Sequence, residues 1–142
     1  MDLTTSYVFD AAHRIAGHPG KCAWLHGHTY RLEVTVSSPA LNRLGMVMDF
    51  DDLRDVVGKA VLDPWDHATL LAADDPLGPA IAAVQREAPD RVVLLPGQPT
   101  AEILTHEAWV RLEARLPAGI TLERVAIRET PDCGSALTRP QT

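Results

Sequence analysis

The sequence predicts an α+β domain, because strand-like alternation occurs near both ends of the chain and helical spacing occurs between them. A chain of 142 residues is long enough for one domain with a single core, so we expect one domain over 1–142 with a flexible tail at 131–142. A hydrophobic content of 46% and a charged content of 23% are those of ordinary folded proteins and exclude a disordered chain.

Two segments in the first part of the chain alternate as strands do. In 4–12, Tyr7 and Phe9 lie on the face opposite Asp10. In 29–36, apolar side chains at every second position face one way, and polar or charged side chains face the other. This second pattern is typical of a half-buried antiparallel strand.

Helical spacing follows. Over 53–61, apolar residues recur at the intervals of an amphipathic helix, after Asp49, which can cap it. A second helix is expected at 80–87, and a third begins after Thr100, whose hydroxyl can serve as the N-cap. A short apolar run before that helix suits a strand or a docked loop, and 121–130 alternates again as a final strand.

The overall charge argues against polymeric anionic partners. A total of 13 Lys+Arg against 19 Asp+Glu gives a net charge of −6, so neither nucleic acid nor an anionic membrane surface is an expected partner. No signal-peptide pattern or bilayer-length apolar run occurs, so we expect a cytoplasmic protein. With only Cys22 and Cys133, no disulfide framework is available, and both thiols are expected to be free.

Histidines are concentrated near the N-terminus, where four of the six lie within 13–28. If the second strand begins early, His26 and His28 share its apolar face, and His13 ends the first strand on its own apolar face. The residues between can loop back, so three imidazoles would meet at one edge of the sheet. Three neutral histidines with an open fourth position are what a catalytic zinc ion requires.

Four more side chains suit chemistry near such a metal. Cys22, beside Lys21, is either a small buried hydrophobe or a thiol that nearby positive charge converts to thiolate. Asp66 and His67 form either a surface turn or an acid–imidazole pair. Glu129 has the buried parity of the final strand, so its carboxylate either lies at the rim or accepts two parallel N–H bonds from a planar, guanidine-like ring edge.

Six motifs then occur in a fixed order across residues 5–131. They are Phe9-Asp10-Ala11-Ala12-His13, Cys22-Ala23-Trp24-Leu25-His26-Gly27-His28-Thr29-Tyr30, Gly45-Met46-Val47-Met48-Asp49-Phe50, Asp66-His67, Pro99-Thr100-Ala101-Glu102 and Glu129-Thr130. In this order they resemble the 6-pyruvoyl-tetrahydropterin synthase family. The short Cys-x3-His-Gly-His spacing is most similar to its bacterial branch, the 6-carboxy-5,6,7,8-tetrahydropterin synthases of the queuosine pathway.

The resemblance implies a tunnelling fold (T-fold), with an antiparallel four-stranded sheet and helices packed on one face. It also implies a homo-oligomer, a hexamer in this family, that closes into a barrel with active sites between subunits. The implied site comprises three Zn²⁺ ligands, a catalytic thiol with two proton-relay partners, and two substrate contacts: His13, His26 and His28; Cys22, Asp66 and His67; Glu129 and Thr100.

The implied small-molecule substrate is 7,8-dihydroneopterin triphosphate. A zinc-dependent lyase would convert it to 6-carboxy-5,6,7,8-tetrahydropterin with release of acetaldehyde and triphosphate; the alternative is 6-pyruvoyl-tetrahydropterin synthase activity on the same substrate. The chemistry of the residues agrees with this assignment. Zinc would stabilise developing alkoxide charge, Cys22 as thiolate would act as a base, and His67 oriented by Asp66 would transfer a proton.

Two other classes of protein stay open at this point. A cupin-like metal enzyme would use His26 and His28 with Glu33, although the glycine that usually follows in cupins is absent. A non-catalytic zinc-binding protein would close the site with Cys22 as the fourth ligand. The chain also has extra length over 72–98 relative to compact family members, which suggests a lid or an altered subunit contact.

Overall fold

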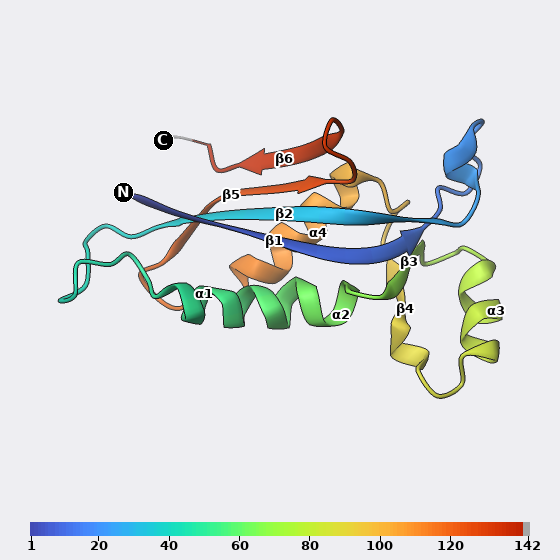
Figure 1. Ribbon diagram of the computed structural model, residues 1–142, viewed down its shortest axis with the longest axis horizontal. Coiled ribbons are helices and arrows are strands. Elements are labelled where there is room, and N and C mark those ends of the chain that lie inside the picture. Colours follow the sequence, from blue (N-terminus) through green and yellow to red (C-terminus); the bar gives the residue numbers. More distant parts are fainter. Residues whose placement is uncertain (141–142) are drawn as a thin grey trace.

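A long antiparallel ribbon organises the fold, which a computed structural model describes for residues 1–140 (Figure 1). Strand β1 (Asp2–His13) pairs with β2 (His26–Ser37) along its whole length, and the pairing ends with His13 opposite His26. The second strand therefore begins three residues before the clean alternation at 29–36, and it includes both histidines of the His-Gly-His motif.

The sheet has six strands in the order β4-β3-β1-β2-β5-β6. On one side, β3 (Ala68–Ala72) and β4 (Val92–Leu95) run parallel to β1. On the other side, β5 (Thr121–Arg128) and β6 (Gly134–Thr138) continue the antiparallel pairing. The α+β class is confirmed, but the expected four-stranded, purely antiparallel sheet is wrong in strand number and in the direction of β3 and β4. These strands are short apolar runs, which show no alternation.

Strand β6 also differs from the flexible tail predicted for 131–142. It pairs with β5, and Gly134 permits this close approach, because a Cβ there would lie 2.5 Å from a carbonyl oxygen of β5. Beyond the strand, the Arg139 guanidinium donates to the Leu122 carbonyl at 2.7 Å. The last two positions of the predicted tail, 141 and 142, lie outside the described residues.

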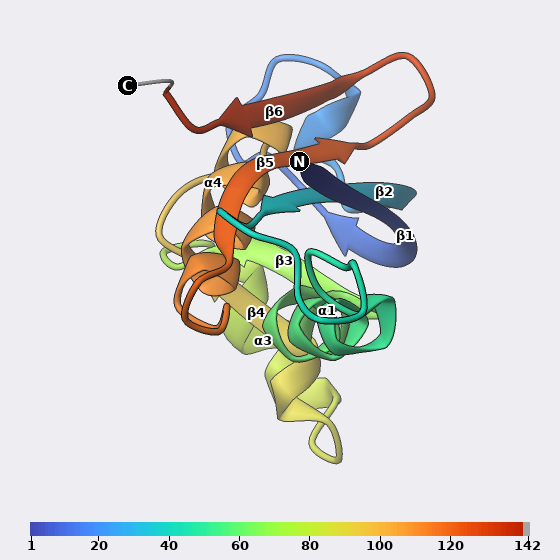
Figure 2. The same ribbon diagram turned by 90° about the vertical axis from the view of Figure 1, so that its left-hand side faces the viewer.

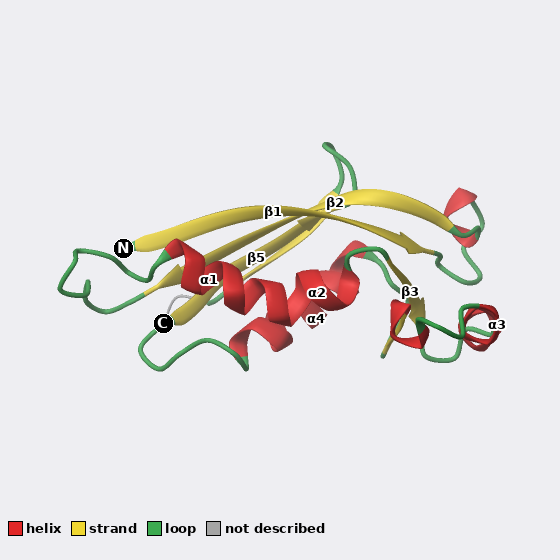
Figure 3. Cartoon of the chain, turned by 60° about the horizontal axis from the view of Figure 1, so that its bottom comes forward, coloured by secondary structure: helices red, strands yellow, loops and turns green. Residues whose placement is uncertain are grey.

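One face of the ribbon is covered by helices (Figure 3). Helix α1 (Phe50–Val57) begins after Asp49, whose carboxylate accepts the Asp51 N–H at 2.8 Å. The helix continues through a π-helical turn, η2 (Gly58–Leu62), into α2 (Asp63–Trp65), so the predicted helix is present and extends to residue 65. This long helix delivers the Asp66-His67 motif to the edge of β1.

The other two helices precede and follow β4 in the sequence. Helix α3 (Leu77–Val84) begins three residues before the predicted 80–87. Helix α4 (Ala101–Glu113) begins where predicted, and the Thr100 hydroxyl accepts the Ile103 N–H at 3.3 Å. No helix formed by residues 1–140 combines the length and the apolar composition that crossing a membrane requires.

The core lies between the covered face of the sheet and the helices. Fully buried side chains at every second position of β2 pack against apolar stripes of the long helix and of α4; they are Tyr30, Leu32, Val34, Val36, Leu53, Val57, Val61, Leu104, Ala108 and Leu112. The opposite, uncovered face of the ribbon carries polar side chains such as Asp10 and Thr29. Seen end-on, the sheet curls, so that β3 and β4 turn down beside the helices (Figure 2).

Candidate active site

Three imidazoles meet on the covered face, where β1 ends and β2 begins. His13 lies opposite His26, and His28 follows two residues along β2, so the three side chains share one face. The ring centroids are 4.6, 4.9 and 5.0 Å apart, and one nitrogen of each ring lies within 4.8 Å of the other two. This histidine triad realises the predicted convergence.

Backbone carbonyls orient two rings of the triad. The Nδ1 atom of His13 lies 2.8 Å from the Pro99 carbonyl oxygen, and that of His26 lies 2.6 Å from the Trp24 carbonyl oxygen. A carbonyl only accepts, so each Nδ1 carries the proton and each Nε2 presents a lone pair. The two Nε2 atoms lie 3.2 Å apart. Two lone pairs at this separation repel each other unless a cation lies between them, so the donor set fits a metal ion.

Burial favours the neutral form of two imidazoles of the triad, His13 and His28. His13 is 1% exposed, and burial lowers its pKa to about 4 despite the bond to Pro99, with the charges of His26 and His28 adding to the decrease. Burial and His26 also lower the pKa of His28. Neutral imidazoles bind metals without first having to release a proton.

The triad has no fourth protein ligand among residues 1–140, since no other histidine, cysteine or carboxylate joins the group. Cys22 is outside it, which argues against a closed four-ligand zinc site. Glu33 has the opposite parity to the buried residues of β2 and pairs with Arg124 at 3.6 Å, so the cupin-like arrangement is not formed. The geometry favours an open site.

Cys22 lies in the loop that connects the two strands of the triad. It is part of the short helix η1 (Lys21–Ala23), and its carbonyl accepts the Ile15 N–H at 2.7 Å. The Ala16 N–H donates to the Gln98 side chain at 2.9 Å, which ties this loop to the segment that also contacts His13. The thiol is free and partly exposed. The structure thus places Cys22 at the triad end of the sheet.

Asp66 and His67, here called the dyad, follow the long helix directly. The His67 Nδ1 atom lies 3.0 Å from a carboxylate oxygen of Asp66, which also accepts the Asp10 N–H at 2.9 Å. The bond from Asp10 and the contact with His67 hold the pKa of Asp66 below its usual range, although partial burial opposes this. An ionised Asp66 fixes the proton of His67 on Nδ1 and leaves Nε2 free.

The dyad and the triad border different faces of the sheet. The His67 side chain is 76% exposed and borders a depression of about 420 Å³, whose lining also includes His28 of the triad. Asp10, Gly27 and Thr29 line it too, and because these three residues alternate with the buried residues of β1 and β2, they belong to the uncovered face. The structure forms the predicted acid–imidazole pair but does not place it beside the triad on the covered face.

Glu129 follows β5 at the rim of the covered face. Burial raises its pKa and the charge of Glu102 adds to the increase, whereas His26 lowers it, so its carboxylate lies within the field of the triad. Within residues 1–140 the Tyr30 hydroxyl is buried without a hydrogen-bond partner, and burial and the charge of Glu129 raise its pKa. Among the described residues this carboxylate forms no ion pair with a basic side chain, and a carboxylate in that position suits a ligand that brings N–H donors.

Thr100 has a structural bond of its own, because its hydroxyl caps α4. The preceding Pro99 carbonyl accepts from His13, so the loop at 98–100 links the helix to the triad. Sequence reasoning missed Pro99, Trp24 and the backbone of Asp10 as supports of the site. Their contributing atoms are backbone groups, and every residue type has these, so no sequence signal marks them.

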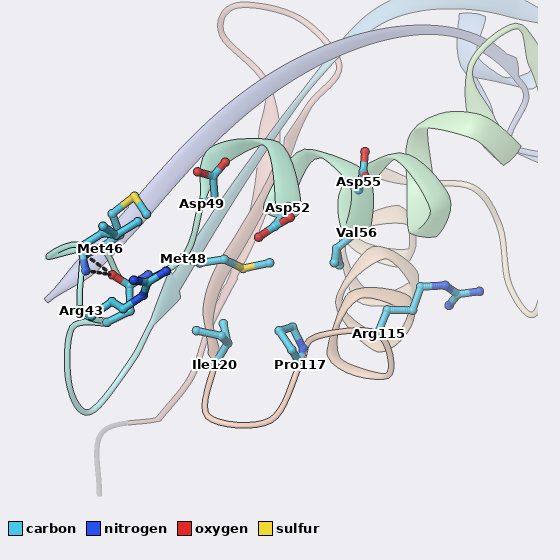
Figure 4. Close-up of a pocket in the computed structure, with 12 residues that line it drawn as sticks. Arg43, Met46, Met48, Asp49, Asp52, Asp55, Val56, Arg115, Pro117 and Ile120 are labelled. Atoms are coloured by element: carbon cyan, nitrogen blue, oxygen red, sulfur yellow. Dashed lines mark hydrogen bonds between the residues drawn. The ribbon is translucent and has the colours of Figure 1, made fainter.

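A larger cavity, of about 1110 Å³, lies at the other end of the ribbon (Figure 4). Met46, Met48 and Ile120 contribute apolar walls, and Asp52 and Asp55 of α1 lie at its edge. None of the predicted site residues lines it. The Gly-Met-Val-Met-Asp-Phe motif borders this cavity, and its aspartate serves as the cap of α1.

Comparison with known proteins places this chain in a family. Residues 2–140 match the family model described as 6-pyruvoyl tetrahydropterin synthase. The chain belongs to the 6-pyruvoyl tetrahydropterin synthase family. The six motifs therefore identify the family correctly, and the expectation of an enzyme of the lyase class is confirmed.

Curated relatives match over nearly their whole length. A 6-carboxy-5,6,7,8-tetrahydropterin synthase from Haemophilus influenzae is 33% identical over 132 residues, covering 91% of this chain and 92% of the relative. One of the same name from Rickettsia felis is 34% identical over 136 residues, covering 94% and 96%. The resemblance to this branch of the family is thus confirmed.

Solved structures agree on the fold. An uncharacterised protein from Wolinella succinogenes superposes with a TM-score of 0.83 at 22% identity, covering 99% of this chain and 98% of that one. The 6-pyruvoyl tetrahydropterin synthase of Caenorhabditis elegans gives a TM-score of 0.70 at 20% identity, covering 99% and 96%. These similarities confirm the predicted T-fold.

Proposed function

We propose that the chain is a zinc-dependent 6-carboxy-5,6,7,8-tetrahydropterin synthase that converts 7,8-dihydroneopterin triphosphate, with release of acetaldehyde and triphosphate. The observation that carries the proposal is the triad: one nitrogen of each of its three rings lies within 4.8 Å of the other two, and the Nε2 lone pairs of His13 and His26 face each other at 3.2 Å. The name shared by the curated relatives and the short Cys-x3-His-Gly-His spacing support this product over a pyruvoyl product. We further propose one cytoplasmic domain that supplies the queuosine pathway.

His13, His26 and His28 would hold Zn²⁺, because three imidazole nitrogens with an open fourth position are the donor set of catalytic zinc sites. The bound ion would supply Lewis acidity toward the side-chain hydroxyls of the substrate. The carbonyls of Pro99 and Trp24 keep the rings of His13 and His26 in the tautomer that presents the Nε2 lone pair to the ion.

Glu129 would anchor the pterin ring. An ionised carboxylate accepts two parallel N–H bonds from an amino-pyrimidine edge, and such donors stabilise the charged form that burial disfavours. The side chain of the substrate would then extend toward the triad, because His26 lies within the field of Glu129. Thr100, in the loop that also contacts His13, would border the same pocket.

Proton transfer would require two subunits. Cys22 lies in the loop at the triad end of the sheet, whereas the dyad borders the uncovered face of the same chain. We therefore propose that His67 of one subunit acts at the triad of another in a homo-oligomer, a hexamer by family resemblance. Cys22 would accept a proton from carbon, and His67, with Nε2 free, would move a proton on the other side of the substrate.

The test is incubation of the purified protein with 7,8-dihydroneopterin triphosphate, followed by identification of products by mass spectrometry. We expect 6-carboxy-5,6,7,8-tetrahydropterin and acetaldehyde, with Cys22→Ala as the inactive control. A pyruvoyl product would support the alternative activity. Absence of any turnover by zinc-loaded protein would contradict the proposed function.

A further inference from the structure

One arginine of the segment at 72–98 contacts the backbone at the start of the dyad. Arg91 ends the short helix η3 (Pro89–Arg91), which follows α3 and precedes β4. Its Nη1 atom donates to the carbonyl oxygens of Asp63 and Asp66, both at 3.2 Å. Its Nη2 atom donates to the Asp90 carboxylate at 3.0 Å. The guanidinium is therefore held in place, and it links the backbone of Asp63 to that of Asp66.

The two carbonyls belong to the end of the long helix that begins at α1. The last carbonyls of a helix have no partner within the helix, and the dipole gives that end a partial negative charge. A guanidinium satisfies both needs, since it donates hydrogen bonds and carries positive charge. Arg91 thus fixes the direction in which the chain leaves the helix at Asp66.

The next residue has an unusual backbone conformation. His67 has a φ of 59°, and among residues 1–140 it is the one residue other than glycine with a positive φ. This region is disfavoured for side chains with a Cβ, so surrounding contacts must hold it. His67 is the residue proposed to transfer a proton. A strained backbone there suits a side chain that must be held in one orientation.

The peptide unit between Asp66 and His67 is held at both ends. Its carbonyl oxygen accepts from Arg91 at 3.2 Å, and its N–H donates to the Asp10 carbonyl at 2.6 Å. Rotation of this peptide plane would change φ of His67 and swing the imidazole away. The bond from the Asp10 N–H fixes the carboxylate of the dyad, but it does not fix this plane.

We propose that Arg91 is a positioning residue for the dyad, so that the segment at 72–98 is part of the apparatus for proton transfer. The inference rests on the proposed function for its effect on turnover. Arg91 acts on the reaction through the backbone of Asp66 and His67, and it needs no contact with the substrate.

The test compares Arg91→Ala and Arg91→Lys with Arg86→Ala in the full-length, zinc-loaded protein. Arg86 is a matched control, because it lies in the same segment, is exposed, and its Nε donates to the Ala83 carbonyl of the preceding helix, α3. In Arg91→Ala, kcat should fall roughly 10- to 100-fold because the imidazole is misplaced, with KM and zinc content unchanged. Lysine keeps the cation but lacks the planar fork, so kcat should be intermediate.

A second readout does not depend on turnover. The ¹⁵N chemical shifts of the His67 ring, assigned with His67→Gln, report which nitrogen carries the proton. The wild type and Arg86→Ala should show a ring protonated at Nδ1, and Arg91→Ala should show the mixture of tautomers of a free histidine. Arg91→Lys retains a cation at the helix end, so it extends the test if the alanine variant does not fold.

Two results would overturn the inference. One is wild-type kcat and a wild-type His67 spectrum in Arg91→Ala. The other is a raised KM with unchanged kcat, which would assign Arg91 to substrate binding. If the wild type itself shows no turnover, the proposed function fails, and the His67 spectrum still decides whether Arg91 positions the dyad.

Discussion

The triad and the dyad lie near the same end of β1 but in opposite settings. The triad is on the covered face, with His13 1% exposed, and carbonyls of two connecting segments hold its rings. The dyad borders the uncovered face, with the His67 side chain 76% exposed and its backbone in a strained conformation. One chain therefore brings the three histidines together on the covered face but leaves the acid–base pair exposed at the uncovered face.

The proposed enzyme must bind a metal and transfer protons, and the difference in setting assigns these two tasks to different parts of the molecule. Metal binding depends on burial and a fixed tautomer, which one chain supplies through its own core. Proton transfer depends on a second surface, which we propose comes from another copy of the chain. Changes to the triad should therefore affect both metal binding and turnover, whereas changes to the dyad should affect turnover alone.

The largest effect is expected from His13→Ala. Removal of one of three ligands should lower the zinc content to below about a tenth of an equivalent per chain and abolish turnover. Metal analysis after zinc supplementation and gel filtration measures the first quantity. His18→Ala is the control, since His18 is an exposed loop histidine that contacts the Gly20 N–H. Retention of zinc by His13→Ala would remove His13 from the proposed ligand set.

Cys22→Ala should abolish turnover and leave the zinc content unchanged. Loss of a base costs roughly 10²- to 10⁴-fold in kcat, and the thiol lies outside the triad. The control is Cys133→Ala, which keeps the backbone carbonyl that accepts from Glu129. Loss of zinc in Cys22→Ala would favour the closed structural site instead.

Mixed oligomers test whether the thiol and the dyad of one active site come from different subunits. Cys22→Ala and His67→Gln should each be inactive alone, but co-expression should restore a measurable fraction of kcat, because some sites then combine an intact thiol with an intact dyad from another subunit. Activity of co-purified, differently tagged chains is the measurement. If the mixture stays inactive while each variant keeps its oligomeric size, both groups act within one chain.

A fall in pH should lower both the stability of the metal-free protein and its retention of zinc. The pKa of His13 is lowered from 6.5 to about 4, so between these values the unfolded chain binds a proton that the folded chain does not. The metal-free protein should therefore lose stability as pH falls from 6.5 to about 4, and zinc should dissociate over the same range. Urea denaturation and metal retention at stepped pH measure this. A flat stability profile over that range would contradict burial of a neutral His13.

Thr100→Ala should have the smallest effect. Loss of the N-cap bond to Ile103 should lower the free energy of unfolding by about 1 kcal/mol, which thermal denaturation detects as a modest fall in Tm. Zinc should stay bound, since His13 contacts the backbone carbonyl of Pro99. Thr100→Ser keeps a hydroxyl and serves as the control. A large rise in KM with unchanged Tm would assign the hydroxyl to substrate binding.

The elements with strong periodicity were predictable. Alternation placed β1, β2 and β5, helical spacing placed α1 and α4, and the caps at Asp49 and Thr100 marked their starts. Strands β3 and β4 were not predictable as parallel strands, because short buried runs show no alternation. Strand β6 was missed because it pairs only along β5 and has mostly exposed side chains.

Within the site, the parity of two strands was sufficient to bring the triad together, since residues at every second position of a strand share a face. The identity of the dyad was also readable from the motif. Its position on the other face was not, because it depends on how the long helix ends and how β3 joins β1. Arg91 gave no signal, since its partners are carbonyls 25 and 28 residues away.

The sequence by itself determined the family, the α+β class and the three histidines that share one face, because these depend on local periodicity and on motif spacing. Only the tertiary structure decided which carbonyls orient the triad and which face the dyad borders. His13 and Pro99 lie 86 positions apart, and the packing of α4 beneath the sheet brings them to 2.8 Å. Contacts of this kind involve backbone atoms that every residue has, so they cannot be predicted from the residue type.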